Sequence, residues 1–180
     1  ILALCGMLTT SGWAQGSGNL VQNGGFDTGD FPPWTTSGDT SPTNLFISIA
    51  YAHSGPRGLL FGSETALSYV SQSVPTVVGQ TYLLSFWVSN EGETPNQFVV
   101  DWGGSTLLNR QNLIAAEWTN MQFIVNATST STLLRFGGMN GPGYTVLDEI
   151  SVTPPGAVVT NVRPVLPTIS PQVIDELARL

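Results

Sequence analysis

Lysine is absent from this 180-residue sequence, and its five arginines stand against twelve acidic residues, which gives a net charge of −7. Nucleic-acid binding depends on basic side chains that neutralise phosphates. Association with an anionic membrane surface needs a similar basic cluster. The scarcity of basic residues therefore argues against both kinds of partner.

Cysteine and histidine occur once each, as Cys5 and His53. A single histidine cannot build a zinc site in a chain without further cysteines unless acids supply most of the ligands. His53 is followed by Ser54, but adjacent residues rarely form a nucleophile–base pair, and no G-x-S-x-G motif is present. The carboxylates are scattered along the sequence, whereas glycosidases need two that face each other. We therefore expect no enzymatic activity.

The sequence has no long hydrophobic run. The apolar stretch 1–8 is well short of the roughly 20 residues that a membrane-spanning helix needs. Small residues at Gly12 and Ala14 suit signal-peptidase cleavage before Gln15, so residues 1–14 are interpreted as an incomplete signal peptide. A membrane anchor is the alternative, but the run is too short for one; lipidation at Cys5 is a second alternative, but Leu4 stands where a small residue is needed. After cleavage the mature chain has no cysteine, and we expect it to be secreted without disulfides.

Charged residues make up only 9% of the sequence, whereas 20 glycines and 12 prolines are spread along it. This composition favours many short strands joined by turns. Strands are expected at 20–23, from residue 34, and at 45–50, 59–61, 66–74, 82–89, 98–102, 105–108, 118–126, 132–138 and 144–153. Regularly spaced short strands predict an all-β fold, an antiparallel β-sandwich or jelly roll, over residues 15–153.

Two stretches carry the clearest strand signals. In 82–89 (YLLSFWVS), Leu84, Phe86 and Val88 share one face, while Trp87 lies on the other. The segments 98–102 and 105–108 are separated by Gly103-Gly104, which predicts a hairpin.

The last strand, YTVLDEISVT (144–153), alternates so that Asp148 is expected on the same inward face as Val146, Ile150 and Val152. A carboxylate among core positions is costly unless it is paired or bound to a cation. Asp27 follows the first apolar run in a glycine-rich bend. We expect the first and last strands to lie close together, with the two aspartates sharing a calcium ion. The next acid, Glu149, is expected to point outward and to be solvated.

Residues 154–180 differ in character from the domain before them. The prolines after Thr153 predict a semi-rigid linker. Ser170 followed by Pro171 suits the start of a helix, which would continue to Leu180 and beyond. The chain is therefore expected to be part of a longer surface protein.

The segment 19–153 resembles the galactose-binding-like β-sandwich of carbohydrate-binding modules, including copies in secreted or surface-anchored bacterial proteins of the sorting-signal and autotransporter types. The resemblance rests on seven stretches in the order of the family: NLVQNGGFDTGDFPPW (19–34), HSGPRGLLFGS (53–63), LSYVSQSV (67–74), GQTYLLSFWVSN (79–90), VVDWGGSTLL (99–108), EWTNMQFIVNATST (117–130) and GPGYTVLDEISVT (141–153). It implies a structural Ca²⁺ held by Asp27, by backbone carbonyls around Gly55 and Arg57, and by Asp148. The family more often has Glu in place of Asp27, and calcium tolerates such variation because it accepts six to eight oxygens at flexible angles.

Aromatic residues are candidates for sugar binding, because the C–H face of a sugar is apolar. Trp34, Trp102 and Trp118 begin or end strands and are expected in the core. Trp87 lies among small polar neighbours and could either stack on a sugar or fill a second layer of the sandwich. The candidate ligand-binding residues are Trp87, Asp101, Asn140, Tyr144, Tyr51 and Asn90.

Two functions remain open at this point. The first is a secreted, non-catalytic, lectin-like module that binds a polysaccharide and is stabilised by calcium. The second is a structural spacer or adhesin-type domain of a surface-anchored protein, with no sugar site. The sequence predicts no nucleic-acid partner and no membrane insertion of the mature domain.

Overall fold

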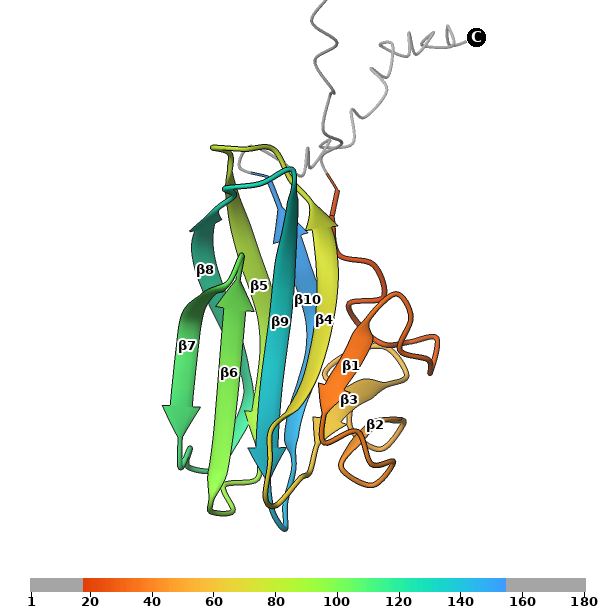
Figure 1. The fold of residues 1–180 in the computed structure, drawn as a ribbon. Coiled ribbons are helices and arrows are strands. Elements are labelled where there is room, and N and C mark those ends of the chain that lie inside the picture. Colours follow the sequence, from red (N-terminus) through yellow and green to blue (C-terminus); the bar gives the residue numbers. More distant parts are fainter. Residues whose placement is uncertain (1–17, 155–180) are drawn as a thin grey trace, which may run out of the picture.

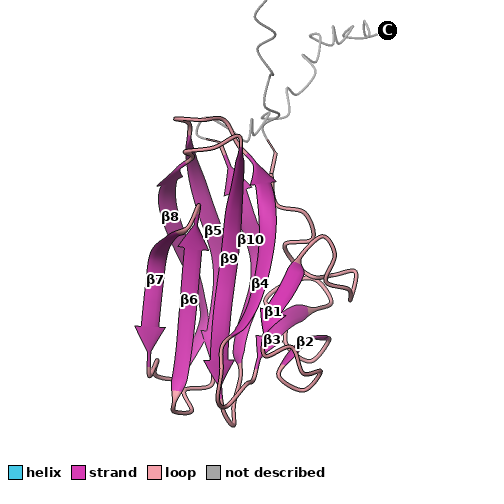
Figure 2. Ribbon diagram, in the orientation of Figure 1, coloured by secondary structure: helices cyan, strands magenta, loops and turns pink. Residues whose placement is uncertain are grey.

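The computed structural model describes residues 18–154, and all the regular structure in that range is β-strand (Figure 2). The ten strands are β1 (Thr35–Gly38), β2 (Leu45–Ser48), β3 (Gly58–Phe61), β4 (Ser68–Pro75), β5 (Thr81–Asn90), β6 (Asn96–Trp102), β7 (Ser105–Gln111), β8 (Ala116–Asn126), β9 (Ser131–Asn140) and β10 (Thr145–Thr153). Within residues 18–154 no helix has the length and apolar character needed to cross a bilayer.

The strands form two five-stranded antiparallel sheets that face each other (Figure 1). One sheet has the order β1-β4-β9-β6-β7, and the other has the order β2-β3-β10-β5-β8. We call them the β4–β9 sheet and the β10–β5 sheet. The predicted antiparallel β-sandwich is confirmed, and so is the hairpin of β6 and β7 across Gly103-Gly104.

The core fills the space between the sheets, as the alternation in β5 predicts. Leu84, Phe86 and Val88 are buried, while Trp87 on the opposite face is half-buried. Phe86 meets Phe136 of β9 edge to face, with ring centroids 5.0 Å apart. Aromatic pairs of this geometry add to the stability that comes from burying their apolar surface.

The first predicted strand, 20–23, is not a strand in the structure. It runs beside β10, where the Leu20 amide donates a hydrogen bond to the Val152 carbonyl at 2.9 Å. The Ile150 amide donates to the Gly24 carbonyl at 3.0 Å. The two ends of the domain therefore lie side by side as expected, although this segment does not form a continuous ladder.

The predicted alternation of the last strand is wrong, because β10 contains a β-bulge. Its pairing with β5 shifts between Asp148 and Ser151, and Glu149 has a φ of 51°. Before the bulge, Leu147 pairs with Val88 and faces the core. After it, Val152 pairs with Leu84 and again faces the core. Because of the extra residue, Asp148 lies on the outer face of the sheet, whereas Val152 lies on the inner face.

Two other predictions lie outside the described residues. They are the incomplete signal peptide at 1–14 and the linker with a helix start at 154–180, of which the structure describes only Pro154.

Candidate functional site

Asp27 and Asp148 meet beside Gly25, as the sequence predicts. A β-carbon on Gly25 would lie 3.2 Å from Asp27 Oδ2 and 3.6 Å from Asp148 Oδ1, so the two carboxylates face the same point. Gly55 also abuts this point, because a β-carbon there would overlap Asp27 Oδ1. The side chain of Arg57 lies against Gly29, in the bend that contains Asp27. The structure therefore brings Asp27, Gly55 and Asp148 together and places the Arg57 side chain against the bend that contains Asp27.

The carboxylate oxygens of Asp27 and Asp148 are ligands that suit a hard cation. Asp148 is fully buried, and Asp27 is exposed. The ion pairs among residues 18–154 join His53 to Glu149 and Arg135 to Asp101, so no arginine in that range neutralises either aspartate. No three His, Cys, Asp or Glu side chains in the described part gather as a metal-binding group. Any cation here would need backbone carbonyls as well, which calcium accepts.

Hydrogen bonds from the loop between β2 and β3 hold Asp148 in place. Its Oδ2 accepts from the amides of His53 at 2.8 Å and Ser54 at 3.2 Å, and its Oδ1 accepts from the amide of Glu149 at 2.7 Å. Burial nevertheless raises the pKa of the Asp148 carboxyl above its usual value, and these three hydrogen bonds oppose that rise. Charge at Asp148 is therefore unfavourable unless a cation balances it.

The raised pKa of Asp148 has a definite sign in the pH dependence of stability. A carboxyl with a raised folded-state pKa destabilises the protein above that pKa, and the cost is relieved as the pH falls through it. In buffer free of divalent cations, acidification from about pH 8 to about pH 5 should therefore raise the melting midpoint of the wild type relative to that of Asp148→Asn. A difference between the two midpoints that stays constant, or moves the other way, would contradict this assignment.

Glu149 is not merely solvated, so that expectation is wrong. The bulge turns its side chain toward the loop, where Oε2 lies 2.7 Å from His53 Nδ1 and Oε1 contacts the Ser54 hydroxyl. The imidazole and the hydroxyl therefore share one carboxylate, which holds Glu149 against the loop.

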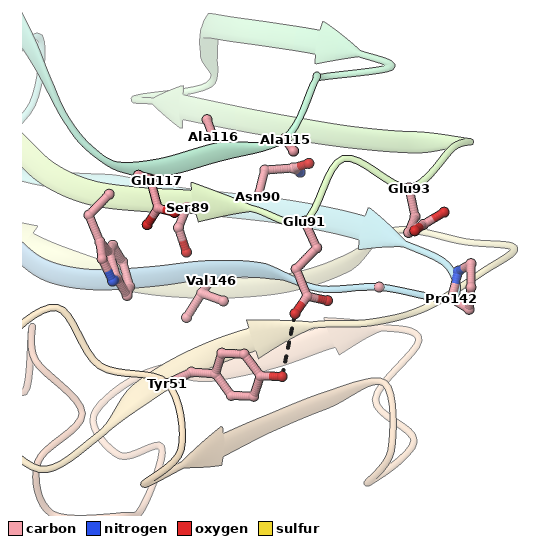
Figure 3. A pocket seen from close by; sticks show the side chains of 12 residues that line it. Tyr51, Ser89, Asn90, Glu91, Glu93, Ala115, Ala116, Glu117, Pro142 and Val146 are labelled. Carbon is pink, nitrogen blue, oxygen red and sulfur yellow. Dashed lines mark hydrogen bonds between the residues drawn. The ribbon is translucent and has the colours of Figure 1, made fainter.

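A groove of about 690 Å³ crosses the outer face of the β10–β5 sheet, close to this loop (Figure 3). Its floor includes Ser89 of β5 and Val146 of β10, which are cross-strand partners. Its walls come from the loops after β2, β5 and β9 and from the start of β8. The remaining lining residues are Tyr51, Asn90, Glu91, Glu93, Ala115, Ala116, Glu117, Trp118, Pro142 and Gly143.

The groove combines aromatic rings with carboxylates. Figure 3 shows Tyr51 reaching toward Glu91 across the groove, and the Tyr51 hydroxyl donates to Glu91 Oε1 at 3.4 Å. Glu91 Oε2 accepts from the Tyr144 amide at 2.8 Å. The Glu91 charge raises the pKa of the Tyr51 hydroxyl. Tyr144 packs against Tyr51 with ring centroids 5.7 Å apart, which fixes the wall that carries Tyr51.

Trp87 lies on the same sheet face, beside the groove. His53 stacks on it with ring centroids 3.8 Å apart and an interplanar angle of 14°. Trp118, which lines the groove, meets His53 edge to face at 5.4 Å. Trp118 is half-buried, so the expectation that it belongs to the core is wrong, whereas Trp34 and Trp102 are buried as expected.

Four of the six predicted ligand-binding residues thus gather at this face: Tyr51 and Asn90 line the groove, and Trp87 and Tyr144 support it. Asp101 does not, because β6 belongs to the other sheet. Asn140 does not either, because its side chain is fully buried. The sequence analysis missed Trp118 and the carboxylates of Glu91, Glu93 and Glu117, which come from two separate segments and converge only in the fold.

Asp101 has a structural role in the β4–β9 sheet. Its Oδ2 accepts from Arg135 Nε at 2.8 Å and pairs with Nη2 at 2.7 Å, and its Oδ1 accepts from the Thr106 hydroxyl at 2.7 Å. Asp101→Ala should therefore lower the free energy of unfolding by about 1–3 kcal/mol, since it leaves these donors unpaired. Urea unfolding measures this loss. An unchanged free energy of unfolding in Asp101→Ala would show that these hydrogen bonds do not stabilise the sheet.

Comparison with known proteins adds information on the fold. No protein-family model matches the sequence, and no curated protein matches it significantly. Among solved structures, the family 61 module TmCBM61 in complex with β-1,4-galactotriose has a TM-score of 0.63 at 22% identity, with 77% of this chain and 99% of that chain covered. The chain has the β-sandwich fold of carbohydrate-binding modules.

Other structures with this carbohydrate-binding-module fold include two family 22 modules. The xylan-binding CBM22-1 domain of Paenibacillus barcinonensis Xyn10C has a TM-score of 0.53 at 19% identity, with coverage of 78% of this chain and 97% of that chain. The C-terminal family 22 module of Clostridium thermocellum Xyn10B has a TM-score of 0.55 at 19% identity, with coverage of 76% and 98%. The fold resemblance therefore spans nearly the whole of each module.

Proposed function

We propose that this domain is a non-catalytic carbohydrate-binding module whose glycan lies in the groove on the outer face of the β10–β5 sheet. The observation that carries the proposal is the groove itself, in which Tyr51 and Trp118 stand among three carboxylates. Apolar ring faces complement the C–H faces of sugars, and carboxylates accept strong hydrogen bonds from sugar hydroxyls. A cleft with a few convergent polar groups is also the usual form of a ligand site.

The fold comparison supports carbohydrate as the ligand class, because structures with a similar fold include a module in complex with galactotriose and a xylan-binding domain. The carboxylates of the groove support binding over hydrolysis. A glycosidase needs a general acid whose pKa is raised by burial. Glu91, Glu93 and Glu117 are all exposed, so the groove offers acceptors for hydroxyls and lacks a buried acid.

The proposal includes a calcium ion at Asp27 and Asp148 that stabilises the domain. Two facts support it: the carboxylates face the same point, and burial makes charge at Asp148 unfavourable. Carbonyls around Gly55 and Arg57 would complete the ligand set. The ion would balance both charges and tie the bend after the first segment to β10. The secreted or surface location remains a prediction from residues 1–14.

Affinity electrophoresis tests the binding function. The purified domain should be retarded in gels that contain a neutral plant polysaccharide, with xylan and galactan as the first two tried, and bovine serum albumin should not be. Retardation by one of them would support the proposed carbohydrate-binding function. Titration calorimetry with the matching oligosaccharide would then give the affinity. Unchanged mobility across a panel of plant and bacterial polysaccharides would favour the alternative, a spacer or adhesin-type domain with no sugar site.

A further inference from the structure

One loop connects the two sites described above. The segment 51–57, here called the 51–57 loop, joins β2 to β3. Tyr51 at its start lines the groove, and Gly55 near its end abuts the Asp27 carboxylate. Between them, the amides of His53 and Ser54 donate to Asp148. A change at the aspartate pair therefore acts on the loop whose first residue, Tyr51, lines the groove.

His53 is the residue through which the two sites touch. Its amide is bound to Asp148, and its ring Nδ1 to Glu149. The same ring stacks on Trp87 at 3.8 Å and meets Trp118 at 5.4 Å. The backbone of this residue thus belongs to the cation site, while its ring sets the position of an aromatic residue in the groove.

We propose that the 51–57 loop couples the two sites, so that a divalent cation at Asp27 and Asp148 raises the affinity of the groove for its glycan, with His53 as the positioning residue. The inference rests on the proposed function and extends it to the regulation of the same site. The hydrogen bond that holds the His53 backbone ends on Asp148, a buried carboxylate with which no arginine of residues 18–154 pairs. A cation beside Asp148 would favour its charged form and strengthen that hydrogen bond, and through His53 it would steady Trp87 and Trp118.

Energetic linkage makes this coupling measurable from both directions. If calcium tightens glycan binding by some factor, the glycan must tighten calcium binding by the same factor. The wild type should lose at least tenfold in affinity for the oligosaccharide when calcium is replaced by a chelator, at a temperature where the metal-free domain is still folded. Calcium affinity, measured with and without the sugar, should change by an equal factor.

Variants of the 51–57 loop separate positioning from general stability. His53→Ala keeps the backbone amide, so its melting midpoint should still respond to chelator, but its glycan affinity should be low with or without calcium. His53→Phe restores a ring between the two tryptophans and should regain most of the coupling. Ser54→Ala is the matched control, because it keeps the hydrogen bond from its backbone amide to Asp148. Its glycan affinity should respond to calcium as that of the wild type does.

Tryptophan emission tests the coupling without any glycan. Calcium should change the emission of the wild type through Trp87 and Trp118, and this change should be absent in His53→Ala and reduced in Trp87→Phe. Equal glycan affinity with and without calcium, or full coupling in His53→Ala, would overturn the inference. If no glycan binds to the domain with or without calcium, the proposed function fails and the emission titration alone tests the coupling. A calcium response that depends on His53 would then support the coupling. The absence of any response would overturn it.

Discussion

Removal of calcium is expected to lower the melting midpoint of the domain by about 10 °C. A ligand that binds only the folded state, at about a hundred times its dissociation constant, contributes about 2.7 kcal/mol. For a domain of this size, each kcal/mol shifts the midpoint by about 2–8 °C. The effect should be large here because the ion would balance a fully buried carboxylate, Asp148, as well as the nearby Asp27. Differential scanning calorimetry with excess calcium or excess chelator measures it.

The variants Asp148→Asn and Asp30→Asn make this prediction specific. Asp148→Asn removes one of the two proposed carboxylate ligands, and its midpoint should not respond to chelator. Asp30→Asn changes an exposed carboxylate three residues from Asp27 and should keep the full response. If the wild type melts at the same temperature with calcium and with chelator, the domain has no stabilising calcium. If Asp148→Asn keeps the shift, a calcium ion is bound elsewhere.

Trp118→Ala is expected to lower glycan affinity by about tenfold or more. Trp118 is a half-buried ring in the groove, and stacking by such a ring is a common source of binding energy at interfaces. A tenfold loss corresponds to about 1.4 kcal/mol. Tyr51→Ala should have a similar effect, because Tyr51 also lines the groove and hydrogen-bonds to Glu91. Titration calorimetry with the retained oligosaccharide measures both losses.

Tyr69→Ala is the control for these groove variants. Tyr69 is also a half-buried aromatic residue on an outer face, but it belongs to the β4–β9 sheet and lies over Gly137, with the Arg135 guanidinium 4.8 Å from its ring centroid. Its loss should leave glycan affinity unchanged. If Tyr69→Ala abolishes binding while Trp118→Ala and Tyr51→Ala do not, the glycan lies on the other sheet and the groove assignment is wrong.

The sandwich could be predicted from the sequence because its strands alternate in a regular way. The apolar positions of β5 repeat every second residue, and the Gly103-Gly104 pair separates two strands that form a hairpin. The meeting of Asp27 and Asp148 followed from the resemblance together with the cost of burying a carboxylate. These features depend on local periodicity or on the order of the motifs along the chain.

The bulge in β10 could not be predicted in the same way. The sequence 144–153 fits an uninterrupted alternation, and only the pairing with β5 shows that Glu149 is the extra residue. Because a one-residue shift moves every later side chain to the other face, this one feature changed the positions of Asp148 and Glu149 together. It also placed Glu149 against His53, a contact that no pattern in the sequence indicates.

The groove is built from loops and from several strands that are distant in the sequence, so the alternation within one strand does not reveal it. Glu91 follows β5, Glu117 and Trp118 lie in β8, and Tyr51 follows β2. Trp118 was expected in the core because it stands near the start of a strand, as Trp34 does. The difference is that Trp34 packs against Phe136 between the sheets, whereas Trp118 lies on the outer face, next to His53.

The most direct test of the account is a nitrogen–proton correlation spectrum of the labelled domain, recorded during titration with the oligosaccharide that calorimetry identifies. If the glycan lies in the groove, the largest shifts should fall on the amides of Tyr51, Ser89 and Glu91 and on the indole of Trp118. The amides of Tyr69 and Gly137, on the outer face of the other sheet, should not move. Shifts confined to those last two residues and their neighbours would contradict the central claim that the groove is the glycan site.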